Sequence, residues 1–188
     1  QVTTNPIAGT RPRGQDERED KALAKELLAD EKEVAEHRML VDLGRNDIGK
    51  IAQNNSVEVT KYMEVEYFRY VMHLTSVVRG QLLPQLTAMD ALKSTLPAGT
   101  VSGAPKIRAM KRIYELEQEK RGVYAGAIGY LSATGDMDFA IAIRTMILKN
   151  GRAYVQAGAG IVYDSIPANE YQETINKAKS MTKIGEMQ

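Results

Sequence analysis

Hydrophobic positions recur at helical spacing in the first part of the chain. Between Asp16 and Leu43 the sequence is dominated by Ala, Leu, Glu and Lys, which are good helix formers. The apolar positions of this stretch are Leu23, Leu27, Leu28, Val34 and Ala35. The pattern predicts one long helix that stops near Gly44. Residues 1–14, with two prolines and two glycines, are expected to form a loop with turns.

The middle of the chain changes from strand to helix patterns. Ser56–Leu83 is rich in Val, Tyr and Thr, which favours strands, although the part from Tyr62 to Met72 is also compatible with helix. Thr87–Thr95 has the pattern of a short helix. Gly99–Lys106 is a glycine-containing loop, and it leads into a helix that is expected to start near Pro105 and end near Gly122.

The last third begins with three strand-like runs, at residues 123–132, 139–148 and 153–163. Turn signals at Gly135 and at Asn150-Gly151 predict hairpins, and therefore an antiparallel meander. A final helix follows Pro167, with Asn169 as its expected cap. Strands and helices that do not strictly alternate indicate an α+β fold.

Composition narrows the class of protein. The chain has 188 residues, of which 43% are hydrophobic, so it can fill a sizeable core. With a net charge of +1, the chain is not expected to be attracted strongly to nucleic acid or to an anionic membrane. The absence of cysteine excludes disulfides, thiolate metal sites and a cysteine nucleophile. A cytoplasmic setting is therefore expected.

Two carboxylate pairs are candidates for a metal site. Glu33 and Glu36 lie three apart on the first predicted helix, so they share one face. Glu170, Glu173 and Lys177 repeat this arrangement on the last helix. The two pairs could converge on a hard cation such as Mg²⁺, which prefers oxygen ligands. From spacing alone, ordinary helix-surface charge is the more common outcome.

Other groups could bind anions. Thr100, Ser102, Gly103 and Lys106 lie where a loop enters a helix, although the run is not a P-loop and also suits a simple capped helix start.

Arg144 stands among small residues in a predicted strand. Gly158 and Gly160 share a face of the next strand, and Tyr124 could add a hydroxyl. Such a face leaves room for a ligand carboxylate, to which an arginine can donate two hydrogen bonds. The alternative is a sheet face that is exposed to solvent. His73 lies in an otherwise apolar run, where a structural histidine is the commoner case.

Several long motifs carry a resemblance to a known family. These runs are 5–14 (NPIAGTRPRG), 36–47 (EHRMLVDLGRND), 97–106 (PAGTVSGAPK), 157–162 (AGAGIV) and 169–174 (NE-x-x-ET). In this order they closely resemble the chorismate-binding family, on its anthranilate-forming branch. The resemblance implies an α+β fold with an antiparallel β-sheet sandwich flanked by helices. It also implies that residues 1–188 are the C-terminal portion of the catalytic domain.

The resemblance implies a reaction and its partners. Ammonia adds to the ring of chorismate, the C4 hydroxyl leaves, and pyruvate is eliminated to give anthranilate, in an early step toward tryptophan. A glutamine amidotransferase subunit supplies the ammonia, and Mg²⁺ is the cofactor. Neither nucleic acid nor a membrane is expected as a partner.

The resemblance also implies roles for the carboxylates and the histidine. Glu36 and Glu173 are expected as direct Mg²⁺ ligands, with Glu33 and Glu170 as supporting carboxylates. Glu33 is in addition the expected general acid for the departing hydroxyl, and His73 is expected to assist the elimination of pyruvate.

The remaining positions are expected to hold the substrate. Tyr124 and Arg144 match groups that bind the enolpyruvyl carboxylate. The residues that match the rest of the pocket lining are Thr100, Gly158, Gly160 and Lys177.

Two other functions remain open. Aminodeoxychorismate synthesis is the rival activity, but its enzymes usually carry a lysine where this chain has Ala8. A non-catalytic piece that only binds metal or partner is the alternative of another class. Nucleic-acid binding through Thr10–Arg13 is disfavoured because the patch is short and the net charge is near zero.

Overall fold

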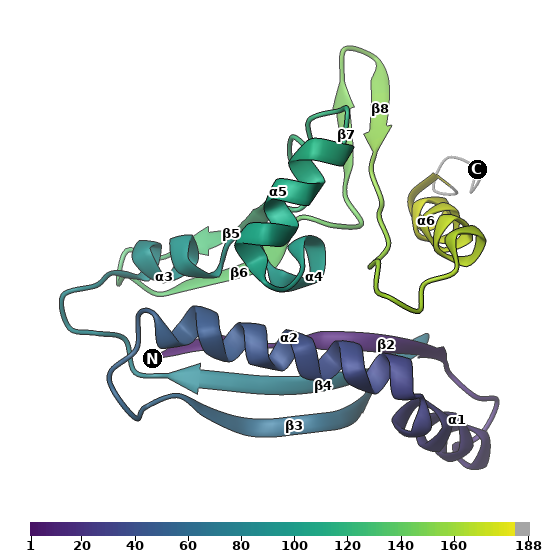
Figure 1. The fold of residues 1–188 in the computed structure, drawn as a ribbon, viewed down its shortest axis with the longest axis horizontal. Coiled ribbons are helices and arrows are strands. Elements are labelled where there is room, and N and C mark those ends of the chain that lie inside the picture. Colours follow the sequence, from purple (N-terminus) through teal and green to yellow (C-terminus); the bar gives the residue numbers. More distant parts are fainter. Residues whose placement is uncertain (183–188) are drawn as a thin grey trace. The chain divides into compact units, whose positions relative to one another are not determined.

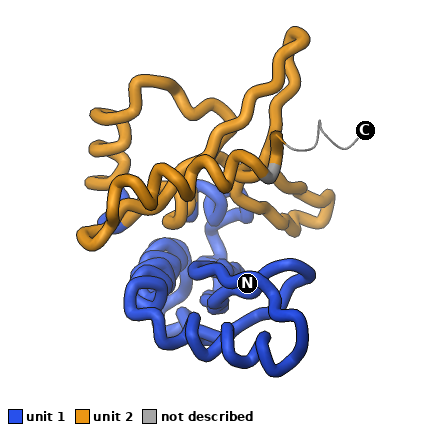
Figure 2. Tube along the Cα trace, turned by 90° about the vertical axis from the view of Figure 1, so that its right-hand side faces the viewer, with its two compact units in different colours: residues 1–95, 104–106 blue, residues 96–103, 107–188 orange. Residues whose placement is uncertain are grey.

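The computed structural model describes residues 1–182 of the chain. The chain forms two compact units (Figure 2). Unit 1 consists of residues 1–95 and 104–106, and unit 2 consists of residues 96–103 and the chain from residue 107 onward. None of the helices within residues 1–182 has both the length and the apolar character that crossing a bilayer requires.

Unit 1 is built on a four-stranded antiparallel sheet around β4 (Val71–Gly80). The strand β3 (Glu58–Tyr67) pairs along one edge of β4. The short strands β1 (Val2–Thr4) and β2 (Ile7–Pro12) pair with successive parts of β4. The prediction of a loop over residues 1–14 was wrong, because pairing with a distant strand, not local propensity, orders these residues.

Two helices replace the single long helix that the pattern predicted. They are α1 (Glu17–Ala29) and α2 (Glu31–Gly49). The break lies at Asp30, which has extended backbone angles and whose side chain accepts a hydrogen bond from the N–H of Glu33, as an N-cap does. The expected stop at Gly44 was also wrong. A Cβ there would lie 3.0 Å from the Cγ2 atom of Thr4, so glycine allows α2 to approach β1 closely.

The core of unit 1 forms where the two helices meet β4. Figure 1 shows α2 lying along the sheet. One cluster combines Ala24 and Leu27 of α1 with Met72 and Leu74 of β4. A second cluster joins the far end of α2 to the other end of the strand and consists of Val41, Ile48, Ala52 and Val78. The helix α3 (Ala88–Thr95) completes the unit and confirms the prediction for Thr87–Thr95.

Unit 2 contains short helices and two separate hairpins. The expected loop at 99–106 contains a helical turn, α4 (Gly99–Ser102). The next helix, α5 (Lys106–Leu116), ends six residues before the predicted end at Gly122. The strands are β5 (Ala127–Leu131), β6 (Met137–Ile141), β7 (Met146–Lys149) and β8 (Arg152–Val155), and the last helix is α6 (Pro167–Thr182). The hairpins β5–β6 and β7–β8 confirm both predicted turns.

The predicted continuous meander was wrong. The run at 139–148 is interrupted between β6 and β7, where Arg144 has a φ of 52°. Residues 157–162 form no strand, so Gly158 and Gly160 do not share a sheet face. The helix α6 starts at Pro167, ahead of the predicted cap Asn169. The α+β class itself, with antiparallel strands, is confirmed.

Candidate functional site

His73 of unit 1 is held by the backbone of β2. Its Nδ1 lies 2.7 Å from the carbonyl oxygen of Gly9 and 3.2 Å from the hydroxyl of Thr10. A carbonyl only accepts hydrogen bonds, so Nδ1 carries the proton that it donates, and Nε2 is the nitrogen left for other chemistry. The ring of Phe68, 5.6 Å away between centroids, packs beside the imidazole.

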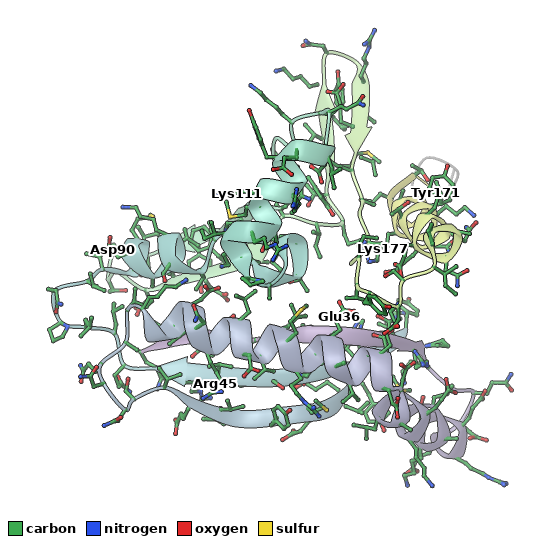
Figure 3. The ribbon with its side chains drawn as sticks, viewed as in Figure 1. Glu36, Arg45, Asp90, Lys111, Tyr171 and Lys177 are labelled. Atoms are coloured by element: carbon green, nitrogen blue, oxygen red, sulfur yellow. The ribbon has the colours of Figure 1, made fainter. Side chains whose placement is uncertain are left out.

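Gly9 also lies beside Glu33. Its φ is +65°, and a Cβ at this position would lie 2.8 Å from Cδ1 of Leu27 and 3.3 Å from Oε2 of Glu33. Glycine is therefore required by both the backbone conformation and the space. As a result, the Glu33 carboxylate on α2 and the His73 imidazole on β4 both lie against Gly9. Glu36 projects from α2 one turn further along (Figure 3).

The second histidine of the chain has a structural place. His37 is fully buried, and its Nε2 lies 2.6 Å from the hydroxyl of Ser76, which also accepts a hydrogen bond from the N–H of Met63. Burial lowers the pKa of His37, so the imidazole is kept neutral. His37 lies on α2, Ser76 on β4 and Met63 on β3. These contacts therefore tie α2, the helix that also carries Glu33, to the sheet.

Unit 2 brings four of the predicted site residues together. A Cβ on Gly158 would lie 2.8 Å from the Tyr124 hydroxyl, so the absence of a side chain there makes room for the phenol. Lys177 donates a hydrogen bond of 3.2 Å to the carbonyl of Gly158 and forms an ion pair with Glu173. Figure 3 shows Lys177 reaching from α6 toward the segment that follows β8.

Burial and nearby charges act on the pKa of Tyr124. Burial raises the pKa of Tyr124, the positive charge of Arg121 opposes that rise, Glu117 adds to it, and Arg144 opposes it. The positive charge of Arg144 thus acts on the pKa of Tyr124, although Arg144 lies in an irregular segment and is exposed. A neutral phenol and a guanidinium are both hydrogen-bond donors, as a carboxylate ligand requires.

Glu170 is the most buried of the four candidate metal carboxylates. Its side chain is 5% exposed on α6. It borders an apolar hollow of about 300 Å³, whose other lining residues include Ala159, Val162, Ser165 and Thr174. Gly160, also predicted to line a substrate pocket, is exposed and is not among the residues that line this hollow.

The Thr100 segment differs from the expected anion loop. Thr100 lies in α4 and is exposed, but the Nζ of Lys106 lies 2.6 Å from the carboxylate of Asp47 and donates to the carbonyl of Thr95. Lys106 is therefore engaged in a buried ion pair, which the sequence analysis missed. The signal for it was a lysine at a helix start, which is too common to identify a partner 59 residues away.

The predicted metal ligands are divided between the two units. Glu33 and Glu36 belong to unit 1, whereas Glu170 and Glu173 belong to unit 2. Within the part of the chain that the structure describes, no group of three or more His, Asp or Glu side chains is arranged to hold a metal ion. The Mg²⁺ site stays a prediction, and so do the catalytic and binding roles of all the residues above.

Fold and side chains together describe an α+β protein with candidate carboxylates in each unit and, in unit 2, side chains that can donate hydrogen bonds to an anion. A family model described as chorismate binding enzyme matches residues 1–183. The chain therefore belongs to the chorismate-binding enzyme family.

Relatives of known sequence point to one branch of this family. Anthranilate synthase component 1 of Lactococcus lactis subsp. lactis (strain IL1403) is 67% identical over 99% of this chain. The protein of the same name from Pseudomonas aeruginosa is 61% identical over 96% of the chain. The chain spans 41% and 37% of the lengths of these two curated relatives.

Solved structures agree with this placement. The crystal structure of anthranilate synthase component I from Streptococcus pneumoniae TIGR4 matches with a TM-score of 0.87 and 83% identity, over 96% of this chain and 39% of that one. MenF, the menaquinone-specific isochorismate synthase from Escherichia coli, matches with a TM-score of 0.84 at 29% identity, over 96% of this chain and 41% of that one. The predicted family and fold class are confirmed.

Proposed function

We propose that this chain carries the chorismate-converting chemistry of an anthranilate synthase component 1, in which chorismate and ammonia give anthranilate and pyruvate. The observation that carries the proposal is the cluster in unit 2, where Tyr124, Gly158 and Lys177 lie together under the influence of Arg144. Its donors suit a carboxylate, and chorismate carries two. The identity to named anthranilate synthases selects the reaction among those of the family.

In this proposal Arg144 and Tyr124 hold the enolpyruvyl carboxylate of chorismate. The guanidinium supplies paired donors, and the phenol, which is neutral near pH 7 as any tyrosine with a pKa of about 10 is, donates one more hydrogen bond. Thr100, Gly158, Gly160 and Lys177 line the pocket. Gly158 and Gly160 bring backbone close to the ligand without a side chain in the way.

Glu33 and His73 handle the protons. Glu33 in its protonated form gives a proton to the C4 hydroxyl as that group leaves the ring while ammonia adds at C2. The Gly9 carbonyl accepts a hydrogen bond from Nδ1–H of His73, which fixes the tautomer. His73 therefore acts through Nε2 in the elimination of pyruvate. Gly9 therefore sets the positions of both groups.

Mg²⁺ is the proposed cofactor, with Glu36 and Glu173 as ligands and Glu33 and Glu170 as supporting carboxylates. The donor set fits the ion, because all four groups offer the hard oxygen ligands that Mg²⁺ prefers. When bound, the ion neutralises the charge of the ring carboxylate and orients the substrate. A glutamine amidotransferase subunit is the proposed source of ammonia, and tryptophan biosynthesis is the proposed setting.

Ala8 separates this proposal from aminodeoxychorismate synthesis. The residue is buried in β2, where it pairs with Leu74, and it offers no amine that could attack the chorismate ring. The reaction that the proposal assigns uses free ammonia and needs no such amine.

Anthranilate fluorescence tests the proposal directly. The chain is mixed with chorismate, ammonium salt and Mg²⁺, and the same assay is repeated with EDTA in place of the ion. In parallel, a hybrid enzyme is prepared in which this chain replaces the matching segment of the Lactococcus lactis relative. We expect Mg²⁺-dependent anthranilate from the hybrid enzyme. A folded hybrid that produces none, while the intact relative does, would refute the proposal.

A further inference from the structure

Arg121 connects two predicted site elements of unit 2. Its NH1 donates a 2.5 Å hydrogen bond to the carbonyl of Val101, the residue after Thr100. Its guanidinium carbon lies 5.6 Å from the centroid of the Tyr124 ring, in the geometry of a cation–π contact. Arg121 therefore contacts both the helical turn that carries Thr100 and the aromatic ring whose hydroxyl faces Gly158.

Glu117 fixes the guanidinium in this position. Its two carboxylate oxygens accept hydrogen bonds from Nε of Arg121 at 3.1 and 2.8 Å, and one of them also accepts from NH2 at 2.5 Å. The Arg121 side chain is 24% exposed, so this ion pair is less screened than one in open solvent. Nε, NH1 and NH2 of Arg121 thus all donate hydrogen bonds, to Glu117 and to the Val101 carbonyl, while the guanidinium carbon lies over the Tyr124 ring.

Only arginine can make this set of contacts. A planar guanidinium offers five N–H donors in fixed directions and stacks on an aromatic face, whereas the ammonium of lysine is a point charge on a flexible stem. Arg121 does not belong to the motifs that suggested the site.

We propose that Arg121 is a positioning residue that holds the Thr100 turn and the Tyr124 ring in one fixed relation, so that both groups meet the same ligand. The inference rests on the proposed function, because it takes the ligand to be chorismate. Arg121 does not touch that ligand; it acts through Val101 and Tyr124. A side chain at Gly158 would collide with the Tyr124 hydroxyl, and the carbonyl of the same Gly158 accepts a hydrogen bond from Lys177.

The charges around Tyr124 provide a readout that simple loss of stability does not imitate. The positive charge of Arg121 opposes the rise that burial causes in the pKa of Tyr124, whereas Glu117 adds to that rise. Removing Arg121 must therefore raise the pKa of Tyr124 further, and removing the charge of Glu117 must lower it. A loosened fold would instead lower the pKa of Tyr124 toward that of a solvated tyrosine in both variants, so a rise in Arg121→Met is the result that separates the two explanations.

The first experiment uses the 188-residue chain itself. Phenolate absorbance of Tyr124 is isolated by subtracting the spectrum of Tyr124→Phe and is followed between about pH 9 and 11. We expect less ionised Tyr124 in Arg121→Met and more in Glu117→Gln than in the parent chain. Arg112→Met is the matched control, since Arg112 lies on α5 and pairs with the exposed Glu115. Its titration should equal that of the parent chain.

The second experiment measures the kinetics of the hybrid enzyme. We expect Arg121→Met to lower kcat/KM for chorismate by about 10- to 100-fold, the effect of a misplacement of roughly 1 Å, and Arg121→Lys not to restore it. Arg112→Met should stay within about twofold of the parent, as an exposed pair does.

The two arms separate the inference from the proposed function. If Tyr124 titrates identically in the parent chain and in both Arg121→Met and Glu117→Gln, the positioning role is refuted whatever the activity. A full rescue of kcat/KM by Arg121→Lys would also refute it. An inactive hybrid enzyme with the expected opposite titration shifts refutes only the proposed reaction.

Discussion

Lys106 and Asp47 form a buried ion pair, with Nζ 2.6 Å from Oδ2 and side chains only 9% and 6% exposed. The same Nζ donates a 3.0 Å hydrogen bond to the carbonyl of Thr95. This hydrogen bond therefore holds together the two ends of the segment 95–106, in which Thr100 lies. Asp47, near the end of α2, anchors that junction.

Loss of Lys106 is expected to destabilise unit 1 strongly. Lys106→Met leaves a buried carboxylate with only the more exposed Lys50, 3.1 Å away, as its ionic partner. We expect the free energy of unfolding to fall by about 3 kcal/mol, as when one member of a buried pair is removed. Lys50→Met removes the exposed partner of the same carboxylate and should cost less than about 1 kcal/mol. Urea unfolding of both variants measures the difference, and equal losses would contradict it.

Gly9 is expected to tolerate no side chain. Gly9→Ala places a Cβ 2.8 Å from Cδ1 of Leu27 at a φ of +65°. Gly151→Ala is the matched control, with a φ of +69° and open space around its Cβ. The control should cost about 1 kcal/mol from backbone strain alone, and Gly9→Ala about 1–3 kcal/mol more from overpacking. Thermal or urea unfolding of both variants decides this, and equal costs would show that space at Gly9 is not limiting.

Local patterns predicted the parts of the fold that local forces decide. The strands β3 and β4, the helix α3 and both hairpin turns follow from residue preference and turn chemistry near each position. The strands β1 and β2 could not be found this way, because they form by pairing with β4, whose partner residues lie 59 to 78 positions further along the chain. Asp30 was readable as an N-cap, but the helix formers on either side concealed the break.

The candidate site was predictable in its residues and not in its arrangement. The family resemblance pointed to Glu33 and His73, but only the fold shows that both lie near Gly9. Arg121 was missed because an arginine four residues after a glutamate is a common surface pair. Its contact with the Val101 carbonyl depends on where α4 ends, which spacing does not give.

The ion pair of Asp20 is expected to make stability depend on pH. The hydrogen bonds from Arg13 and from the N–H of Gly14 hold the pKa of Asp20 below its usual value. A carboxyl group with a lowered folded-state pKa stabilises the fold above its unfolded pKa of about 3.9, and this contribution is lost as the pH falls below that value.

Asp20→Asn should therefore unfold at a lower urea concentration than the parent chain at pH 7, and the difference should shrink toward pH 3, roughly one unit below the ordinary pKa. Asp42→Asn, at an exposed position that pairs with Arg45, should match the parent at both pH values. A difference for Asp20→Asn that stays constant with pH would assign its effect to packing instead of charge.

Removal of either proposed Mg²⁺ ligand should abolish activity. Glu36→Gln or Glu173→Gln replaces a charged oxygen ligand by a neutral amide, and we expect kcat/KM of the hybrid enzyme to fall by at least about 100-fold. Part of this loss should be recovered at high Mg²⁺, which is the measurement that separates weak metal binding from a damaged fold. Glu31→Gln, exposed on the same helix as Glu36, is the control. Near-normal rates in Glu36→Gln or Glu173→Gln would rule out that residue as a ligand.

Arg144 should govern binding of the substrate carboxylate. The positive charge of Arg144 acts to lower the pKa of Tyr124. Arg144 has a left-handed backbone conformation, with a φ of 52°, and lies in the break between β6 and β7 instead of on a regular sheet face. Arg144→Ala removes a charge-assisted hydrogen bond, whose loss costs about 1.5–3 kcal/mol and corresponds to roughly a 10- to 100-fold rise in the KM for chorismate. Arg152→Ala, at an exposed position on β8, should leave KM unchanged. Steady-state kinetics of the hybrid enzyme compare the two variants, and equal KM values would place Arg144 outside the binding site.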